Sequence, residues 1–370
     1  MEKRLDLKKL SQIRTKKYPL ITFYFTAPSP FEWKEKANIF IKSMASKHEK
    51  KLSRELLSGF KADIEEIKNY INYKLGKTVK SFAFFVCGKE NLFEFYQVPF
   101  PITNLFYSGI TPYLKPLAKT LDDYGKYILV ILHVNYSCIY VIDRTEIIEG
   151  VCKEDKIPVK TRKAGWKNLE KPRAERRRGE HIKKHYKDVV EIVRNSMDKR
   201  ISRIIIAGTK KNSNMFLNYL PNYLKNIVSA TFQYDAHYND FKIIEKSLEV
   251  EIESEVNADK KLVKQLMEEF GKEKVAAGLY QVLMALQRGQ IIKLIIHHKF
   301  GEPGWLCDKC GYLGSGRSGT CPICKGKMIE IEDIVDEVIN KAINYDIDVD
   351  FVSEKVFVDN FGGIAAILRY

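Results

Sequence analysis

Short apolar runs alternate with charged stretches through the first third of the chain. ITFYFTAP (21–28) and SFAFFVCG (81–88) are rich in β-branched and aromatic residues and end at Pro or Gly, a pattern that predicts buried strands. FEFYQVPF (93–100) is expected to be the hairpin partner of the second strand. The heavily charged residues from Phe31 to about Asn72 predict helix.

The same alternation continues to residue 270. Strands are expected in YILVILHVNYSCIYVID (127–143, two adjacent strands), EIIEGVC (146–152), RISRIIIAGT (200–209) and IVSATFQYDA (227–236). Helices are expected over about Arg173–Met197, over MFLNYLPNYLKNIV (215–228) and over 239–270. Strands that alternate with helices are typical of α/β units.

The remaining residues predict a third unit of the same kind. Its elements are a helix in AAGLYQVLMALQRG (276–289), a strand in IIKLIIHH (291–298), a helix in EDIVDEVINKAINY (332–345), a strand in DIDVDFV (346–352) and the final FGGIAAILRY (361–370). A chain of 370 residues is too long for one ordinary core. We therefore expect an α/β (α+β) fold in three domains, 1–125, 126–270 and 271–370.

Positive charge is the strongest feature of the composition. The net charge is +15, the sign found in proteins that neutralise phosphates and release counterions. No apolar run approaches the length needed to span a bilayer, and the start, MEKRLDLKKL, lacks the apolar stretch of a signal peptide. We expect a cytoplasmic protein with no membrane partner.

Much of that charge lies in one segment. Between Lys153 and Lys187 there are fourteen Lys or Arg against five Asp or Glu, around a single Gly165–Trp166 pair. A solvated helix face is the alternative explanation, but such faces mix the two signs more evenly. We favour RNA contact, with Arg forks on phosphates and Trp166 stacked on an unpaired base. The candidate contacts are Arg162, Lys163, Gly165, Trp166, Lys167, Arg173, Arg176, Arg177 and Arg178.

Four of the seven cysteines form two C-x-x-C pairs. CDKC supplies Cys307 and Cys310, and CPIC supplies Cys321 and Cys324, with ten residues between the pairs. Four thiolates on tight turns favour one tetrahedral Zn²⁺ with no open position, so we expect a structural site in a ribbon over 305–328. Disulfides are the alternative, which a cytoplasmic chain disfavours. The other cysteines are expected to be small buried side chains: Cys87, Cys138 and Cys152.

The last domain carries a family resemblance. AAGLYQVLMALQRGQIIKLIIHH (276–298) and FGGIAAILRY (361–370) resemble the C-terminal domain of archaeal and eukaryotic class I peptide-release factors (release factor/Pelota-like), whose archaeal members often insert a four-cysteine ribbon here. IIIAGTKK (204–211) looks like the strand of the family's middle domain. The N-terminal layout is most similar to the bacterial and archaeal branch that includes the ribosome hibernation factor Balon. The resemblance implies a three-domain architecture across nearly the whole chain.

The residues that release peptide in this family are missing. Family members that terminate translation carry Gly-Gly-Gln on a basic loop of the middle domain, where this chain has Gly165 followed by Trp166. The only Gly-Gln pair, Gly289–Gln290, lies in the third domain. We find no Ser-His-Asp set, paired carboxylates or phosphate-cradling loop in its place, and so expect no catalytic residue.

Codon recognition is also in doubt. Stop-codon readers carry Asn-Ile-Lys-Ser at a helix start, and NIFIKS (38–43) has those letters with Phe40 and Ile41 inserted. Topology directs Asn38, Lys42 and Ser43 to the decoding centre if the resemblance extends to this domain. The alternative is a charged helix whose apolar residues partly face a core.

Three functions compete. The first is a non-catalytic factor of hibernation or rescue type that occupies the ribosomal A site and contacts its rRNA and that of the peptidyl-transferase centre. The second is a peptidyl-tRNA hydrolase, release factor or tRNA-cleaving rescue enzyme with a divergent loop. The third is a protein that binds tRNA or mRNA off the ribosome. tRNA and an elongation-factor-like GTPase, which would dock on the C-terminal domain, are further partners that the resemblance allows.

Overall fold

The computed structural model of the chain has two compact units. It describes residues 5–27, 32–50, 52–76, 79–98, 100–123, 125–143, 146–156, 171–198, 201–234, 240–270, 274–316 and 319–369. Residues 1–123 and 258–370 form what we call the discontinuous unit, and residues 124–257 form the middle unit. Helices make up 44% of the chain and strands 30%, which confirms the mixed α/β class. The division into three domains stays a prediction.

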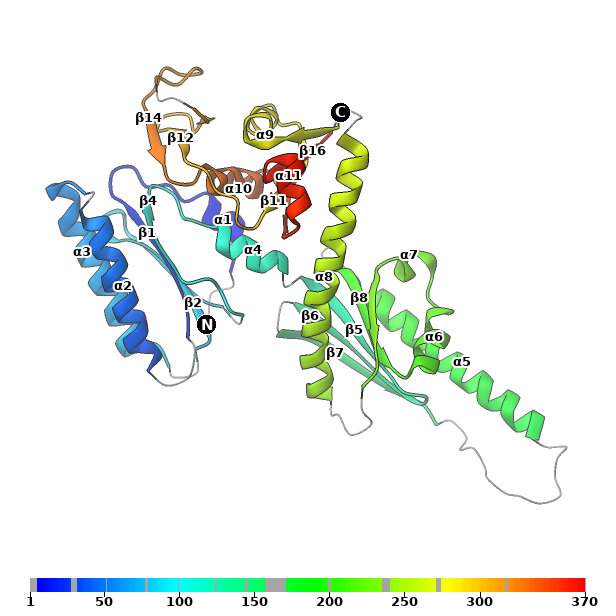
Figure 1. Ribbon diagram of the computed structural model, residues 1–370. Helices are drawn as coiled ribbons and strands as arrows, with labels where there is room; N and C mark the ends of the chain where they lie inside the picture. Colours follow the sequence, from blue (N-terminus) through cyan, green and yellow to red (C-terminus); the bar gives the residue numbers. More distant parts are fainter. Residues whose placement is uncertain are drawn as a thin grey trace. The chain divides into compact units, whose positions relative to one another are not determined.

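The N-terminal part of the discontinuous unit is an antiparallel sheet covered by helices (Figure 1). Its strand order is β3-β2-β1-β4. Phe23, Phe82 and Phe84 pack against helices α2 and α3 in an aromatic core. The predicted strands and their hairpin are confirmed, whereas the predicted helical stretch is two helices. The elements are α1 (Leu7–Ser11), β1 (Leu20–Thr26), α2 (Trp33–Glu49), α3 (Arg54–Asn69), the π-helix η1 (Tyr70–Lys74), β2 (Ser81–Cys87), the 3₁₀-helix η2 (Gly88–Glu90), β3 (Leu92–Val98), β4 (Leu105–Gly109) and α4 (Lys115–Asp123).

The C-terminal part of the same unit has its own sheet, of order β10-β16-β11-β15. Helices α9 and α10 pack on one face, and α11 and the last turns of α8 pack on the other. FGGIAAILRY therefore supplies an inner strand of the core, as expected. Gly363 has φ +86, and a Cβ there would clash with the Phe300 ring. The elements are α8 (Asp240–Phe270), β10 (Val275–Ala277), α9 (Gly278–Gln287), β11 (Ile291–His297), α10 (Ile334–Asn344), β15 (Asp348–Val352), α11 (Lys355–Phe361) and β16 (Ile364–Leu368).

A small antiparallel sheet lies between β11 and α10 in the sequence. Its strands are β12 (Gly304–Cys307), β13 (Leu313–Gly314) and β14 (Met328–Ile331), in the order β13-β12-β14. Leu306 and Leu313 pack into the core that α10 shares with the larger sheet. These strands hold the four cysteines of the C-x-x-C pairs at their turns.

The middle unit is a five-stranded sheet with helices on both faces. The order is β7-β6-β5-β8-β9, in which β5, β8 and β9 are parallel and β6 and β7 form an antiparallel edge. Helices α5, α6 and α7 pack on one face, and the first turns of α8 pack on the other. The elements are β5 (Lys126–Leu132), β6 (Tyr136–Asp143), β7 (Glu146–Glu154), α5 (Lys171–Asn195), β8 (Ile201–Gly208), α6 (Lys210–Leu217), α7 (Asn222–Lys225) and β9 (Val228–Phe232).

Within the described ranges, no helix combines the length and the apolar character needed to cross a membrane.

Buried acids join the two parts of the discontinuous unit. Asp336 on α10 accepts a hydrogen bond from the Lys115 backbone N–H at 2.7 Å and from Asn340 Nδ2 at 3.1 Å. Asp333 accepts one from the Tyr113 hydroxyl at 2.7 Å. Burial, together with the nearby Glu337 carboxylate, raises the pKa of Asp336 well above its usual range. The junction therefore favours the protonated form of Asp336.

This shift makes the junction sensitive to pH. Because the folded pKa of Asp336 is raised, its contribution to stability is complete below the ordinary carboxyl pKa and is lost as pH rises towards the folded one. We predict that the free energy of unfolding of Asp336→Asn, relative to wild type, rises with pH above about 4, by at most about 1.4 kcal/mol per pH unit. Urea unfolding at several pH values measures it. The exposed Asp359→Asn is the control, and a pH-independent difference for Asp336→Asn would contradict the prediction.

Candidate nucleic-acid interface and metal centre

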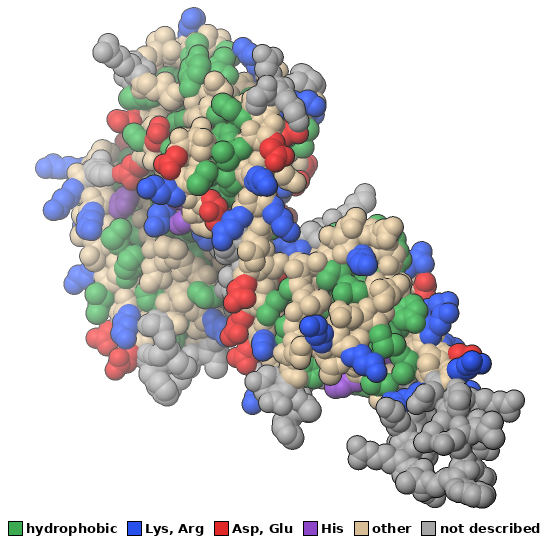
Figure 2. All heavy atoms as spheres, turned by 45° about the vertical axis from the view of Figure 1, so that its right-hand side comes forward, with side chains coloured by type: hydrophobic (Ala, Val, Ile, Leu, Met, Phe, Trp, Pro, Cys, Tyr) green, Lys and Arg blue, Asp and Glu red, His purple; other side chains and the backbone are tan. Residues whose placement is uncertain are grey.

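Helix α5 presents a cationic face on an apolar base. Tyr186, Val189 and Val193 are buried against the sheet. The opposite face is exposed and carries Arg176, Arg177, Lys183, Lys184 and Lys187. Figure 2 shows Lys and Arg side chains spread over the visible face of this unit, with some acidic side chains beside them. This surface is suited to a polyanion.

The predicted RNA contacts are only partly described by the structure. Arg176 and Arg177 are exposed on α5, and Arg178 is half-buried. Arg173 belongs to α5 by its backbone, and its side chain is outside the description. Five of the predicted contacts lie outside the described residues: Arg162, Lys163, Gly165, Trp166 and Lys167.

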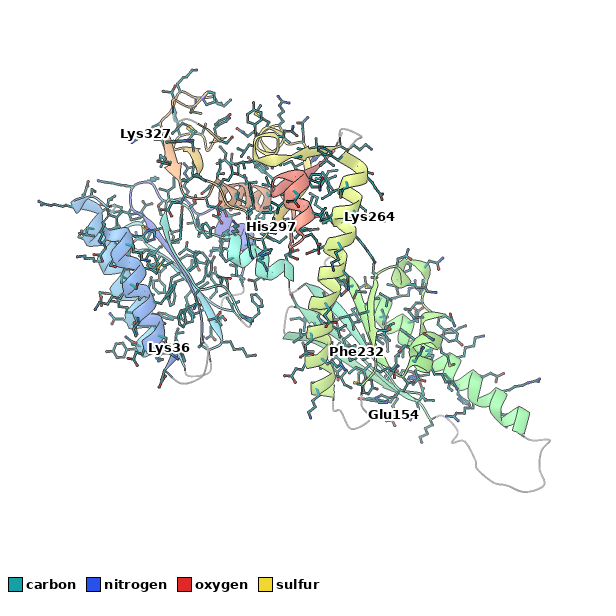
Figure 3. All side chains as sticks on the ribbon, viewed as in Figure 1. Lys36, Glu154, Phe232, Lys264, His297 and Lys327 are labelled. Atoms are coloured by element: carbon teal, nitrogen blue, oxygen red, sulfur yellow. A yellow bond between two sulfur atoms is a disulfide. The ribbon has the colours of Figure 1, made fainter. Side chains whose placement is uncertain are left out.

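A chain of hydrogen bonds fastens α5 to the sheet edge. His185 Nδ1 lies 2.6 Å from Asp155 Oδ2, and His185 Nε2 lies 2.9 Å from Ser137 Oγ. Since a carboxylate only accepts, Nδ1–H donates to Asp155 and Nε2 accepts from the Ser137 hydroxyl in the neutral ring. The hydrogen bond from His185 and the charge of Lys153 lower the pKa of Asp155. Figure 3 labels the neighbouring Glu154, the last residue of β7.

A Ser-His-Asp set was not expected from the sequence, but the structure contains one. Ser137, His185 and Asp155 have the order and spacing of a catalytic triad. However, the Ser137 and His185 side chains are fully buried, so the hydroxyl cannot meet a substrate. The set anchors α5, and Lys153 supports it through Asp188 at 3.1 Å. The periodic spacing of apolar residues along β6 and α5 indicates that Ser137 and His185 face inward. It does not show that the two side chains meet, which only the three-dimensional structure reveals.

The candidate decoding residues lie in the middle of α2, away from a helix start. Asn38 Nδ2 donates to the Lys34 carbonyl at 2.8 Å and to Asn72 Oδ1 at 2.9 Å. Lys42 and Ser43 are exposed, and Ile41 is buried in the core. Asn38 therefore links α2 to η1, and the role of the three residues in decoding stays a prediction.

Four thiols converge in the small sheet. All four Sγ atoms lie within 4.8 Å of one another, and Cys307–Cys324 and Cys310–Cys321 are each 3.5 Å apart. Zn–S bonds of about 2.3 Å imply S–S separations near 3.8 Å in a tetrahedron, so the set fits a metal ion. Gly326 lets the chain pass close by, since a Cβ there would stand 3.1 Å from Cys307 Sγ and Cys324 Sγ.

The thiols of this cluster are shifted in opposite directions, and burial together with hydrogen bonds among the thiols raises the pKa of Cys310 to about 12. Burial raises the pKa of the Cys307 thiol, but hydrogen bonds from the backbone N–H groups of Cys310 and Lys309 outweigh it and lower that pKa to about 6. The Arg14 guanidinium donates to the carbonyls of Cys307 and Asp308 at 3.0 and 3.2 Å. The N-terminal segment thereby contacts the first cysteine turn directly.

The remaining cysteines differ from the expectation of separate buried side chains. Cys87 is buried and free, as expected. Cys138 is buried but forms a disulfide with Cys152, whose residue is exposed on the edge strand β7. The two face each other directly in the β6–β7 register, a pairing that sequence spacing alone does not show.

Family models match most of the chain. Bacterial archaeo-eukaryotic release factor family 10 matches residues 112–251, and eRF1 domain 3 matches residues 256–370. The chain is 25% identical over 298 residues to peptide chain release factor subunit 1 of Thermococcus sibiricus. The alignment covers 70% of this chain and 69% of that relative.

Solved structures of related factors align over long stretches with low scores. An archaeal translation termination factor, aRF1, is 19% identical over 98% of this chain and 95% of its own, with a TM-score of 0.27. Saccharomyces cerevisiae Dom34, a translation termination-like factor described as interacting with Hbs1, is 11% identical over 78% and 80%, with a TM-score of 0.40.

Together, the family models and the curated relative define the class of this protein as a translation factor. Within that class, the chain belongs to the release-factor/Pelota-like family, as the tail and ribbon residues suggested.

Removing the anchor of α5 should lower the free energy of unfolding. His185→Ala leaves the buried Ser137 hydroxyl and the Asp155 carboxylate without their partner, so we predict a loss of about 1–3 kcal/mol in the free energy of unfolding. Lys184→Ala, on the exposed face, should change it by less than about 0.5 kcal/mol. Urea unfolding measures both. A fluorophosphonate probe should leave Ser137 of the native protein unlabelled, and labelling there would show a reactive serine.

Proposed function

We propose that this chain is a ribosome-binding factor that occupies the A site in a release-factor-like pose without releasing peptide. The observation that carries the proposal is the cationic face of α5, held rigidly on the sheet of the middle unit. Arg176 and Arg177 are exposed on that face, where their guanidinium groups can donate hydrogen bonds to phosphate oxygens.

Loss of the family's catalytic tripeptide supports a non-catalytic role. The sequence contains no Gly-Gly-Gln. Gly289, of the only Gly-Gln pair, has φ +67 and forms the turn between α9 and β11, where it ends a helix of the C-terminal core. We infer a role of hibernation or rescue type, in which A-site rRNA is contacted through α5 and residues 162–167.

A second function stays in competition. A peptidyl-tRNA hydrolase or tRNA-cleaving rescue enzyme would use a divergent loop in place of the tripeptide. The buried state of Ser137 disfavours the Ser-His-Asp set as that enzyme's nucleophile. The family relation adds three points to the proposal. Asn38, Lys42 and Ser43 would contact the decoding centre. tRNA would be a further partner, and a GTPase would dock on residues 271–370.

The four-cysteine cluster completes the proposal as a structural zinc site in a ribbon over 305–328. Cys307, Cys310, Cys321 and Cys324 would hold the ion and leave no position open for a substrate. The ion would cross-link turns of a sheet whose own core is small.

The metal prediction is one equivalent of zinc per chain. Cys310→Ser should lose the ion and lower the melting temperature of the discontinuous unit, whereas Cys87→Ser should keep a full equivalent. Elemental analysis of the purified proteins, with thermal unfolding before and after chelation, measures this. Free thiols in a folded, metal-free protein of unchanged stability would refute the site.

The cationic face should dominate ribosome binding. Changing Arg176, Arg177 and Arg178 to Glu should abolish co-sedimentation with 70S ribosomes. For wild type, each phosphate contact should add about 0.7–0.9 to the slope of log affinity against log salt. The matched control changes Lys260, Lys261 and Lys264, which are exposed on α8, to Glu with the same change in net charge. If both triple variants lost ribosome binding equally, the effect would come from the overall charge of the protein and not from the α5 face.

Peptide release should stay at background. Two adjacent glycines permit the close backbone approach that Gly165–Trp166 does not, and positioning of a water accounts for up to about 7–11 kcal/mol of a barrier. The assay uses ribosomes carrying labelled peptidyl-tRNA at stop and sense codons, with the protein in excess. Release above the no-factor rate that disappears on mutating residues 162–167 would establish the hydrolase instead.

A further inference from the structure

The Cys138–Cys152 disulfide lies one register step from the contacts that hold the cationic helix, with Cys138 in the core on the opposite, α8-covered face of the sheet. In the β6–β7 ladder, Cys138 is opposite Cys152, and the next pair is Ser137 opposite Lys153. Ser137 and Lys153 belong to the anchor of α5, through His185 and Asp188. The disulfide is therefore one register step from the contacts that fix α5.

The two sulfurs differ in access. Cys138 is fully buried, whereas Cys152 is exposed on β7, an edge strand of the sheet. The Tyr136 hydroxyl oxygen lies 2.8 Å from Cys138 Sγ and 3.4 Å from Cys152 Sγ. An incoming thiolate can thus reach Cys152, and a phenol stands beside the sulfur that would leave.

Other thiols of the chain do not compete for this exchange. Cys87 is buried, and burial raises the pKa of its thiol to about 11, which makes it a poor nucleophile. The remaining four are gathered in the discontinuous unit with metal-ligand spacing. The chain thus has one disulfide beside five cysteines outside any disulfide; disulfides of proteins in reducing compartments are usually transient or redox-active.

We propose that Cys138–Cys152 is a reversible thiol–disulfide exchange site whose co-substrate is a small dithiol. A thiolate of the dithiol attacks Cys152 Sγ, the S–S bond breaks, and its electron pair passes to Cys138 Sγ. That thiolate accepts a hydrogen bond from Tyr136 and takes a proton from water. The second thiol of the reagent then attacks the sulfur bonded to Cys152, which releases the Cys152 thiolate and closes the disulfide of the reagent. The protein gains two electrons, and the dithiol loses them.

Thiol–disulfide exchange would control the affinity of the protein for RNA, an inference that rests on the proposed function. With the disulfide closed, the end of β7 is tied to β6, and Lys153 and Asp155 hold α5 in place. After reduction, only backbone hydrogen bonds to β6 hold this end of the edge strand β7. The end of β7 therefore separates from the sheet more often. Since a preorganised surface binds more tightly, the oxidised form is the stronger binder.

The test compares oxidised and reduced protein directly. Full-length protein is equilibrated with dithiothreitol and its cyclic oxidised form at set ratios, the free thiols are alkylated, and peptides are mapped by mass spectrometry. When alkylation follows unfolding in a chelator that removes any bound zinc, the oxidised form should contain a linked Cys138–Cys152 peptide and five alkylated cysteines, against seven after reduction. Affinity for 70S ribosomes should fall by about three- to tenfold on reduction.

Variants separate this site from the rest of the chain. The double variant Cys138→Ser with Cys152→Ser should bind like the reduced form and ignore the dithiol, and Cys87→Ser should respond like wild type. Failure to form the linked peptide at any ratio overturns the exchange site. Equal affinity for ribosomes in both redox states would show that the disulfide does not control binding. The proposed function would stand in that case. Absence of ribosome binding in both states overturns the proposed function and the control together, and the linked peptide alone then decides the exchange chemistry.

Discussion

The packing of α5 on the sheet of the middle unit is the interaction on which the functional surface depends. The helix contains nine Lys or Arg and four Asp or Glu, and like charges one turn apart cost about 0.2–0.5 kcal/mol each. Burial of a large apolar side chain stabilises by about 1.5–3 kcal/mol. Tyr186, Val189 and Val193 are all buried here, so packing outweighs the repulsion. The Asp155–His185–Ser137 hydrogen bonds then fix which face points outwards.

The same arrangement explains why the proposed binding surface does not require a Gly-Gly-Gln loop. Phosphate contact needs charge on a rigid support, which α5 supplies whatever residues precede it. Hydrolysis needs a close backbone approach and a placed water, both of which depend on particular residues of a loop. Loss of Gly-Gly-Gln is therefore compatible with the proposed RNA-binding surface. The Ser-His-Asp set does not restore chemistry, because its hydroxyl is buried.

Local patterns carried most of the sequence-based prediction. The strands at 81–87, 126–132 and 201–208 are dominated by apolar residues, and helix α5 is strongly amphipathic, so these elements were predictable. The cysteine cluster was also predictable, because the two cysteines of each C-x-x-C pair lie on a single turn. Short elements such as α4, β10 and α11 were missed, since few residues cannot show a period.

Contacts between distant segments could not be predicted. The Cys138–Cys152 pair and the Ser137–His185–Asp155 set depend on the register of β6 with β7 and on the rotation of α5. The junction of Tyr113 and Lys115 with α10 joins residues more than 200 positions apart in sequence. The family resemblance identified the class of protein, but these contacts required the three-dimensional structure.

Chemical footprinting of ribosomal RNA tests the central claim most directly. Ribosomes with an empty A site are probed with and without saturating protein, using wild type and the variant with Arg176, Arg177 and Arg178 changed to Glu. The account predicts protection of A-site nucleotides in the peptidyl-transferase centre by wild type, and none by the variant. Protection confined to regions outside the A site, or unchanged protection by the variant, would contradict it.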